Sequence, residues 1–306
     1  RPPQAAPRAV DHRAPLLPAP LFAPSVRSAN PVSDRHRINM LAFSTDWSLA
    51  GVNPYIMGFL PLYQVERVSR FAASKGLNRV GILALASAYG NVVTKSFNQV
   101  AAQSGISIVE NTTFQPGTKN LAPVVRNFAR FDARNNAGAL KTSPYDAVFI
   151  PVGGQDARAI GSLLSHYELP PRTVRRLGTG LLDETSLASE SNLEGAWFAA
   201  PPPNARAGFE DRFIRTFGSR PPRLSTLSYD ATALVAILAQ RGLQQSGRPS
   251  FSQSDLGNPN GFSGVDGIFR FRRGNTIERG LAIVEFRRGK LIVADPAPTT
   301  FQSLSQ

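Results

Sequence analysis

The sequence predicts an α/β fold built from repeated strand–helix units. Short apolar runs rich in β-branched residues alternate, over residues 38–177, with stretches whose apolar residues recur every three or four positions. Each unit spans about 25 to 40 residues, which suits parallel strands joined by right-handed helical crossovers. The chain has 306 residues, of which 42% are hydrophobic, enough for two lobes with their own cores.

The first block contains the repeated units in order. A helix is predicted to begin at Pro61, which suits the first helical position, and to stop at Gly76. Strands are then expected at 80–85, 106–109, 147–152 and 174–177, with helices at 92–101, 124–131 and 160–167 between them.

The pattern changes after residues 194–200, where Pro201–Pro203 forms a stiff junction. Helices are predicted at 209–217 and 227–243. Strands at 280–287 and 291–294, joined by residues 288–290, predict a terminal hairpin. Two blocks with a proline-rich junction suggest two lobes that exchange chain.

The first 31 residues hold eight of the 25 prolines, so residues 1–20 are expected to be extended or disordered. They contain no initiator Met and no apolar signal-peptide core, and the chain has no run of 18 apolar residues. We therefore expect neither a signal peptide nor a membrane span in this sequence, and we expect it to start at an internal or processed point.

Composition argues against an enzyme. The absence of cysteine excludes a thiol nucleophile, a disulfide, a thiolate zinc site and an iron–sulfur cluster. Of the three histidines only His166 lies beyond residue 37, near a predicted helix end, where a surface or capping role is expected. A multi-histidine metal site or a Ser-His-Asp triad has little to be built from. The sequence predicts no catalytic residues, no metal and no cofactor.

The net charge is +13, with 29 arginines and five lysines. These basic residues occur singly or in pairs, without the aromatic-interleaved stripe or long basic run typical of nucleic-acid binding. A solvated, arginine-rich surface is therefore expected, and no nucleic-acid partner.

Two glycine-containing turns follow predicted strands, at the position where open α/β sheets bind ligands. Gly153 and Gly154 follow the strand ending at Val152; the next glycine is Gly161, so this is no dinucleotide fingerprint. A turn that lets a ligand approach the backbone beside Gly154 and Gln155 fits better. Residues 178–184, with Gly180 and Asp183, are either a ligand turn or simply a helix start with acidic residues.

Hydroxyl and aromatic side chains supply the other candidates. Ser44, Thr45 and Asp46 follow an apolar run, where they either hold a small polar ligand or cap a helix. No nucleophile-elbow sequence surrounds Ser44, which disfavours a hydrolase. Tyr89, beside a turn, and Tyr229, within a helix, either line a cleft or pack in the core.

Taken in order, several of these segments resemble the type I periplasmic binding fold of the Leu/Ile/Val-binding proteins. Within that group the chain is most similar to alphaproteobacterial lipoproteins that are penicillin-binding protein activators or substrate-binding proteins of ABC transporters. The resemblance covers roughly residues 16–301 and rests on an ordered set of short motifs, none of them diagnostic alone: 21–23, 41–46, 57–61, 87–90, 145–149, 177–180, 229–231, 258–262, 264–267 and the terminal hairpin.

The resemblance implies two Rossmann-like lobes with parallel sheets around a cleft, joined by three crossing segments. These would lie near Pro61, near residues 200–203 and near residues 262–267. Lobe 1 would then comprise 16–60 plus 204–262 and lobe 2 would comprise 61–203 plus 263–298, with a disordered leader at 1–15 and a tail at 299–306. The family has two further βα units, about 60 residues, before Leu16, so the first lobe is expected to be N-terminally incomplete.

The resemblance also implies a non-enzymatic extracytoplasmic protein that binds a small polar ligand such as an amino acid or peptide. Its partner would be an ABC permease or, for an activator of peptidoglycan synthesis, a penicillin-binding protein. It would be a periplasmic lipoprotein whose signal peptide and lipobox lie outside this sequence. The alternatives are a small-molecule sensor and, least favoured, a hydrolase that uses the cleft.

The family pattern is matched only in part. Ser44 and Thr45 match the carboxylate-gripping turn and Tyr89 matches the cleft tyrosine. The family's serine cluster is absent, with only Ser25 nearby, and Gly180 stands where relatives have the glutamate that pairs an ammonium. A buried ammonium without a carboxylate is costly, which argues against an amino-acid ligand. The expected ligand-binding residues are Ser44, Thr45, Asp46, Tyr89, Gly154, Gln155, Gly180, Asp183 and Tyr229.

Overall fold

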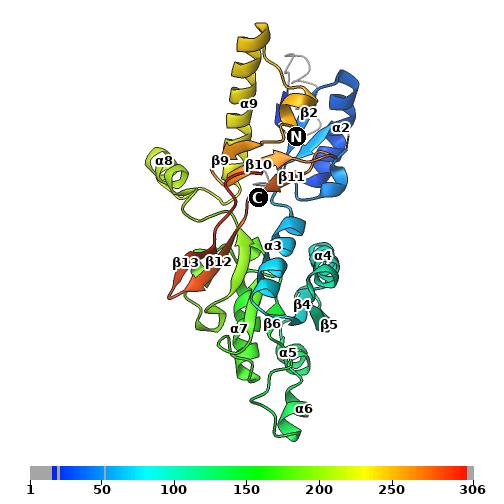
Figure 1. The fold of residues 1–306 in the computed structure, drawn as a ribbon, viewed down its shortest axis with the longest axis vertical. Helices are drawn as coiled ribbons and strands as arrows, with labels where there is room; N and C mark the ends of the chain where they lie inside the picture. The colour runs from blue at the N-terminus through cyan, green and yellow to red at the C-terminus, as the bar shows by residue number, and fades with distance from the viewer. Residues whose placement is uncertain (1–15, 19–20, 52, 302–306) are drawn as a thin grey trace, which may run out of the picture. The chain divides into compact units, whose positions relative to one another are not determined.

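The computed structural model describes residues 16–18, 21–51 and 53–301. Its helices and strands belong to two compact units (Figure 1). Unit 1 consists of residues 1–60, 204–280 and 297–306, and unit 2 of residues 61–203 and 281–296. The leader expected at residues 1–15, and residues 302–306 of the expected tail, lie outside the described residues.

Unit 2 is built on a seven-stranded sheet in the order β13-β12-β8-β7-β6-β4-β5. The strands β4 to β8 run parallel, and β12 and β13 form an antiparallel hairpin on β8. The predicted parallel units and the terminal hairpin are therefore confirmed. The strands are β4 Arg79–Leu85, β5 Ser107–Phe114, β6 Ala147–Phe149, β7 Arg175–Gly178, β8 Trp197–Ala200, β12 Ala282–Arg287 and β13 Lys290–Asp295.

Helices cover both faces of this sheet, and alternate residues of β4 point to the two layers. Val80 and Ile82 pack in the cluster formed with α3 and α4, whereas Gly81 lies against Phe128 and Tyr145 on the other face, the face of α5. The helices of unit 2 are α3 Pro61–Ser74, α4 Ala88–Ser104, α5 Ala122–Phe128, α6 Phe131–Asn136 and α7 Gly154–His166, with 3-10 turns η2 Gly180–Leu182, η3 Thr185–Leu187 and η4 Ser191–Leu193.

Two elements of unit 2 are shorter than the sequence predicts. The helix expected at 124–131 breaks into α5 and α6 because Arg130 adopts a left-handed conformation with φ of 50°. The strand expected at 147–152 ends at Phe149, just before Pro151, which has no N–H for a ladder hydrogen bond.

Unit 1 contains two small sheets, a parallel one in the order β1-β2-β3 and an antiparallel one in the order β11-β10-β9. A parallel bridge between Ile56 and Thr276 links them. The strands are β1 Leu16–Pro18, β2 Asn39–Ala42, β3 Pro54–Ile56, β9 Phe262–Gly264, β10 Gly267–Phe271 and β11 Ile277–Arg279. The helices are α2 Ala23–His36, α8 Ala207–Phe217, α9 Ser225–Ser246 and α10 Gln253–Leu256, with a 3-10 turn η1 Trp47–Leu49.

The third crossing lies later in the chain than the sequence suggested. Residues 263–280 belong to unit 1, and the chain enters unit 2 at Leu281 rather than near residues 262–267. Buried polar contacts explain the difference: Asp230 of α9 accepts a hydrogen bond from the Val265 N–H at 2.7 Å and pairs with Arg279 of β11 at 3.5 Å. Both ionic side chains are almost fully buried, so removing either would leave an uncompensated charge in the core.

The arginine excess is not confined to the surface. Four arginines are buried in the described part of the chain. In unit 2, Arg134 donates to backbone carbonyls that include Ala129 O and Glu168 O, and Arg176 donates to Val174 O and Leu169 O. Burial lowers the pKa of Arg176 to about 9. The expectation of a solvated arginine surface is therefore wrong for these residues: Arg134, Arg176, Arg206 and Arg279.

The lack of a side chain at Gly81 is required by the packing beneath β4. A Cβ at this position would lie 2.6 Å from Phe128 Cζ and 3.0 Å from Tyr145 Cε1. We expect Gly81→Ala to lower the free energy of unfolding of unit 2 by about 1–3 kcal/mol through overpacking, measured by urea denaturation. Gly51→Ala is the control, because a Cβ there meets no atom within 4 Å. An equal effect of the two substitutions would contradict this account.

Candidate functional site

The carboxyl ends of β4, β6 and β7 form the candidate ligand-binding edge of unit 2. Along the chain β5 is added on one side of β4 and β6 on the other, so the strand order reverses at β4. Ligands of open α/β sheets bind at such a switch point, beyond the carboxyl ends of the strands. The residues that follow these three strands are 86–90, 150–155 and 179–183.

Tyr89 reaches from the first turn of α4 to the end of β7. Its Oη donates a hydrogen bond to Thr179 Oγ1 at 2.8 Å. Burial raises the pKa of the Tyr89 phenol to about 12, and the hydrogen bond with Thr179 opposes part of that rise. The start of α4 is shaped by Ser87, which accepts from the Gly90 N–H, and by Gly90, whose Cβ would lie 1.9 Å from Leu85 O. The tyrosine predicted from sequence therefore lies at the switch point.

Gly180 follows Thr179, and its backbone N–H is bound by Gln64 of α3. The Gly180 N–H donates to Gln64 Oε1 at 2.7 Å, and the Thr179 side chain accepts from the Leu181 N–H. Gln64 is 7% exposed and Thr179 is fully buried. A hydroxyl, an amide and a backbone glycine thus converge with the phenol of Tyr89 at this edge.

Gly153 and Gly154 allow two loops of the same edge to approach closely. A Cβ on Gly153 would lie 2.4 Å from Leu181 O, so only glycine fits there, and Gly154 has φ of +51°. No described side chain caps α7 at Gly153. The exposed Gln155 follows in the first turn. In this structure the group that lies close to the Gly153 backbone is the carbonyl of Leu181 in the neighbouring loop.

Asp183 ends the η2 turn and is partly exposed. It stands three residues beyond Gly180, at the end of the same turn, so it is a carboxylate beside the switch-point residues. The structure therefore places five of the predicted residues at one edge of unit 2: Tyr89, Gly154, Gln155, Gly180 and Asp183.

The predicted residues Ser44, Thr45 and Asp46 belong to unit 1 and follow β2. Ser44 is buried and its Oγ accepts from the Asp46 N–H at 3.1 Å. Asp46 caps η1, accepting from the Ser48 N–H at 3.0 Å, and it forms an ion pair with Arg27 at 2.8 Å. The capping interpretation therefore holds for Asp46, while Thr45 is exposed.

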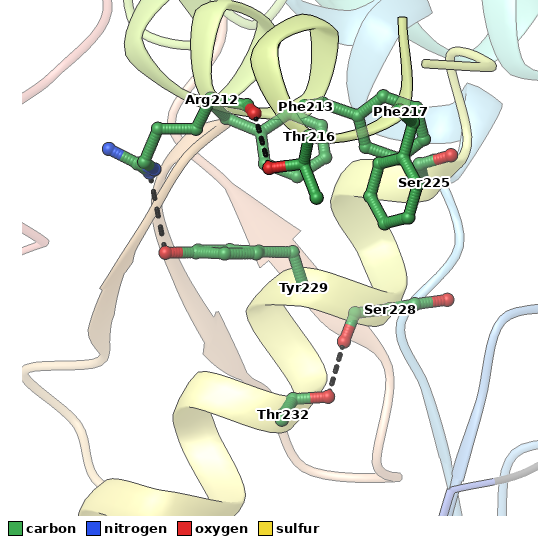
Figure 2. Close-up of a pocket in the computed structure, with 9 residues that line it drawn as sticks. Arg212, Phe213, Thr216, Phe217, Ser225, Ser228, Tyr229 and Thr232 are labelled. Atoms are coloured by element: carbon green, nitrogen blue, oxygen red, sulfur yellow. Dashed lines mark hydrogen bonds between the residues drawn. The ribbon is translucent and has the colours of Figure 1, made fainter.

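Tyr229 also belongs to unit 1, on α9, where it lines a groove against α8 (Figure 2). Its Oη accepts a hydrogen bond from Arg212 Nη2 at 3.3 Å, and its ring packs edge-on against Phe209. Tyr229 is 42% exposed, so it is not the packed core residue of the alternative interpretation. His166, by contrast, ends α7 as an exposed residue stacked edge-on with Tyr167, in agreement with the surface role expected.

Sequence reasoning missed two residues of the unit 2 edge. Thr179 was passed over between two glycines, although a hydroxyl directly after a buried strand is a recognisable signal. Gln64 gave a weaker signal, an amide among the apolar residues of the first turns of α3. Its role depends on α3 lying beside the end of β7, which no local pattern reveals.

None of the described helices combines the length and the hydropathy of a membrane span.

Sequence comparison identifies the family. The profile of the periplasmic binding protein family matches residues 3–290. The chain therefore belongs to the periplasmic binding protein family, as its resemblance to Leu/Ile/Val-binding proteins implied. No curated protein matches the chain.

Solved structures share the fold at low sequence identity. A branched-chain amino acid ABC transporter periplasmic ligand-binding protein from Burkholderia xenovorans superposes with a TM-score of 0.72 at 15% identity, covering 99% of this chain and 83% of that one. A leucine binding protein from Thermotoga maritima gives 0.66 at 16%, covering 97% and 84%. A solute binding protein of an ABC transporter from Rhodopseudomonas palustris, in complex with 3,4-dihydroxybenzoic acid, gives 0.66 at 18%, covering 97% and 82%. These likenesses show the type I periplasmic binding fold.

The environment of Tyr89 gives a measurable titration. Since burial raises its pKa from 10.0 to about 12, the folded state keeps its proton above the pH at which the unfolded chain loses it. We expect the folded protein to lose the stabilising contribution of Tyr89 as pH rises from about 10 to about 12. Burial also raises the pKa values of Tyr55 and Tyr145, so the titration of Tyr89 is isolated by difference. The phenolate absorbance of the parent minus that of Tyr89→Phe should show a step near pH 12. The same scan in guanidinium is the control, where all tyrosines should titrate near their ordinary value. A parent-minus-variant difference centred near pH 10 would refute the buried environment.

Proposed function

We propose that this protein is a non-enzymatic, extracytoplasmic receptor that binds a small polar ligand and delivers it to an ABC permease. The observation that supports this most directly is the convergence of Tyr89, Thr179 and Gly180 at the switch point of unit 2. In a family of solute-binding proteins, a buried phenol and hydroxyl at this position suit hydrogen bonding to a ligand rather than catalysis.

The start of α7 favours a ligand with an anionic group. α7 has 13 residues and begins at Gly154 without a side-chain cap, so its first amide N–H groups and its dipole favour a negative charge there, part of which Asp156 of the first turn supplies. Gly154 and Gln155 would bring these groups to the ligand, and Tyr89 would contact its body. A carboxylate-bearing solute fits this arrangement.

The neighbouring residues suit an aromatic or aliphatic acid better than an α-amino acid. The glutamate expected to pair an ammonium is replaced by Gly180, and Asp183, partly exposed, is the nearest substitute in the same turn. Among the fold relatives, the Thermotoga maritima protein is a leucine binding protein and the Rhodopseudomonas palustris protein holds 3,4-dihydroxybenzoic acid. The proposal therefore includes both amino acids and aromatic acids, and it favours the aromatic acids.

A second candidate is an envelope regulator that contacts a penicillin-binding protein and activates peptidoglycan synthesis. One observation favours it: the polar groups at the unit 2 edge already satisfy each other, Tyr89 with Thr179 and the Gly180 N–H with Gln64. A site paired internally in this way suits a fold reused for protein contact. For both candidates we propose a periplasmic location and a lipid anchor outside this sequence.

Thermal shift with a defined ligand panel tests the receptor. The panel contains leucine, other amino acids, short peptides, benzoate and 3,4-dihydroxybenzoate. A ligand at about 100 times its Kd contributes about 2.7 kcal/mol, which corresponds to a rise in Tm of about 5 °C or more. We expect a saturable rise with a carboxylate from the panel, lost in Tyr89→Ala and retained in His166→Ala, an exposed change at the far end of α7.

A flat response to every solute would overturn the receptor. If the unsubstituted protein also binds a purified penicillin-binding protein in a pull-down and stimulates its transpeptidase activity, the envelope regulator becomes the supported function. A ligand-induced rise in Tm that persists in Tyr89→Ala would support the receptor function but would contradict the proposed binding edge of unit 2.

A further inference from the structure

Unit 1 has an open groove that the proposed ligand site does not use. It lies between α8 and α9 and has a volume of about 490 Å³ (Figure 2). One wall is aromatic and comes from α8; the other is built from Ser225, Ser228, Tyr229 and Thr232 of α9. We call it the α8–α9 groove.

The aromatic wall is a ladder of three phenylalanines spaced four residues apart. Phe209 and Phe213 are 5.9 Å apart between ring centroids, and Phe213 and Phe217 are 4.5 Å apart. Exposure rises along the ladder, from 7% at Phe209 to 65% at Phe217. An exposed phenylalanine that lines the same groove as a half-exposed Tyr229 forms the kind of apolar surface that proteins keep for a partner.

Two of the four serine and threonine hydroxyls that line the groove are paired within their own helices. Thr216 Oγ1 donates to the Arg212 carbonyl at 2.9 Å, and Thr232 Oγ1 donates to the Ser228 carbonyl at 2.8 Å. With these two hydroxyls paired to their own helices, most of the surface that lines the groove is apolar. The groove therefore suits an apolar side chain.

The edge of the groove is cationic. Arg212 is the charged residue among those described as lining it, and within the described residues it pairs with no carboxylate; Nη2 donates to Tyr229 Oη. Arg215 in the last turn of α8 and Arg220 in the loop after it are also exposed. The exposed acidic residue of α8 is Asp211, so positive charges outnumber negative ones at this edge. The acid Glu210 is already paired with Arg206. The partner's complementary charge is therefore negative.

This charge distinguishes between occupants. A second copy of the chain would bring the same arginines to the contact, and residues 1–15 carry three arginines against one aspartate. Both would be repelled. A small molecule is also a poor fit, since small-molecule sites enclose most of their ligand, whereas Phe217 stays 65% exposed. A flat lipid surface does not enter a concave groove between two helices.

We propose that the α8–α9 groove docks an acidic amphipathic helix of a partner protein. Its apolar residues, spaced three and four positions apart, would insert between the phenylalanine ladder and α9, and its flanking carboxylates would pair with Arg212 and its neighbours. Helix-in-groove recognition uses such anchors, with aromatic residues supplying most of the binding energy.

Selection from a display library tests the proposal without a known partner. The full chain is presented to a random library of peptides about 16 residues long, enough for four helical turns. We expect the enriched peptides to combine apolar residues at helical spacing with a net negative charge. The best peptide is then synthesised and its Kd is measured by fluorescence anisotropy at two salt concentrations.

Matched variants locate the binding. Phe217→Ser and Arg212→Glu change exposed side chains, so both should fold, which circular dichroism checks. We expect each substitution to raise the Kd for the peptide by about tenfold or more, as for an interface hot spot. Arg273→Glu is the charge control, an exposed arginine of the β10–β11 turn outside the groove, and should leave Kd unchanged.

Other results would overturn the proposal. Enriched peptides that are neutral or basic, or that bind Phe217→Ser as tightly as the parent, would exclude an acidic helix in this groove. A dimer dispersed by Phe217→Ser in sedimentation would assign the groove to a second copy. Binding of the parent, but not of Phe217→Ser, to phosphatidylcholine/phosphatidylglycerol vesicles, with no peptide enriched, would assign it to a membrane.

Discussion

The reversal of strand order at β4 is the constraint on which the binding edge of unit 2 depends. Because β5 and β6 lie on opposite sides of β4, the chain crosses the sheet in two senses. α4 consequently packs with α3 on one face, while the first turns of α4 and α7 remain at the same edge. Tyr89 and Gly153 meet the loop after β7 there for this reason, not because of any motif that joins them in sequence.

Glycines make that edge possible by letting backbones approach where a Cβ would collide. At Gly90 the obstacle is the carbonyl of Leu85, and at Gly153 it is the carbonyl of Leu181. Unit 1 repeats the device at Gly58, whose Cβ would lie 2.2 Å from Ser44 O. In each case the obstacle is backbone, which cannot move aside as a flexible side chain can, so these turns tolerate no larger residue.

Unit 1 depends on a different interaction, a buried set of ionic groups. Asp230 of α9 pairs with Arg279 of β11, and the fully buried Asp266 pairs with Arg223 at 3.0 Å. Burial raises the pKa of Asp230, which the charge of Arg279 opposes. The first pair attaches β11 to α9, and the second attaches the turn between β9 and β10 to the loop before α9, which explains why residues 263–280 belong to this unit.

Local patterning by itself predicted the alternation of parallel strands and helices in unit 2, the terminal hairpin and the family resemblance, because apolar period and glycine or proline punctuation act within about ten residues. It also identified Tyr89 and Gly180. It did not predict the break at Arg130 or the strand β8. Tertiary structure alone decided that Gln64 holds the Gly180 N–H, that Asp46 pairs with Arg27, that Tyr229 lines a groove, and that Arg176 is buried. Each of these depends on contacts between elements distant in the chain or on the packing around a single side chain, and the composition of a segment does not encode which element will lie beside it.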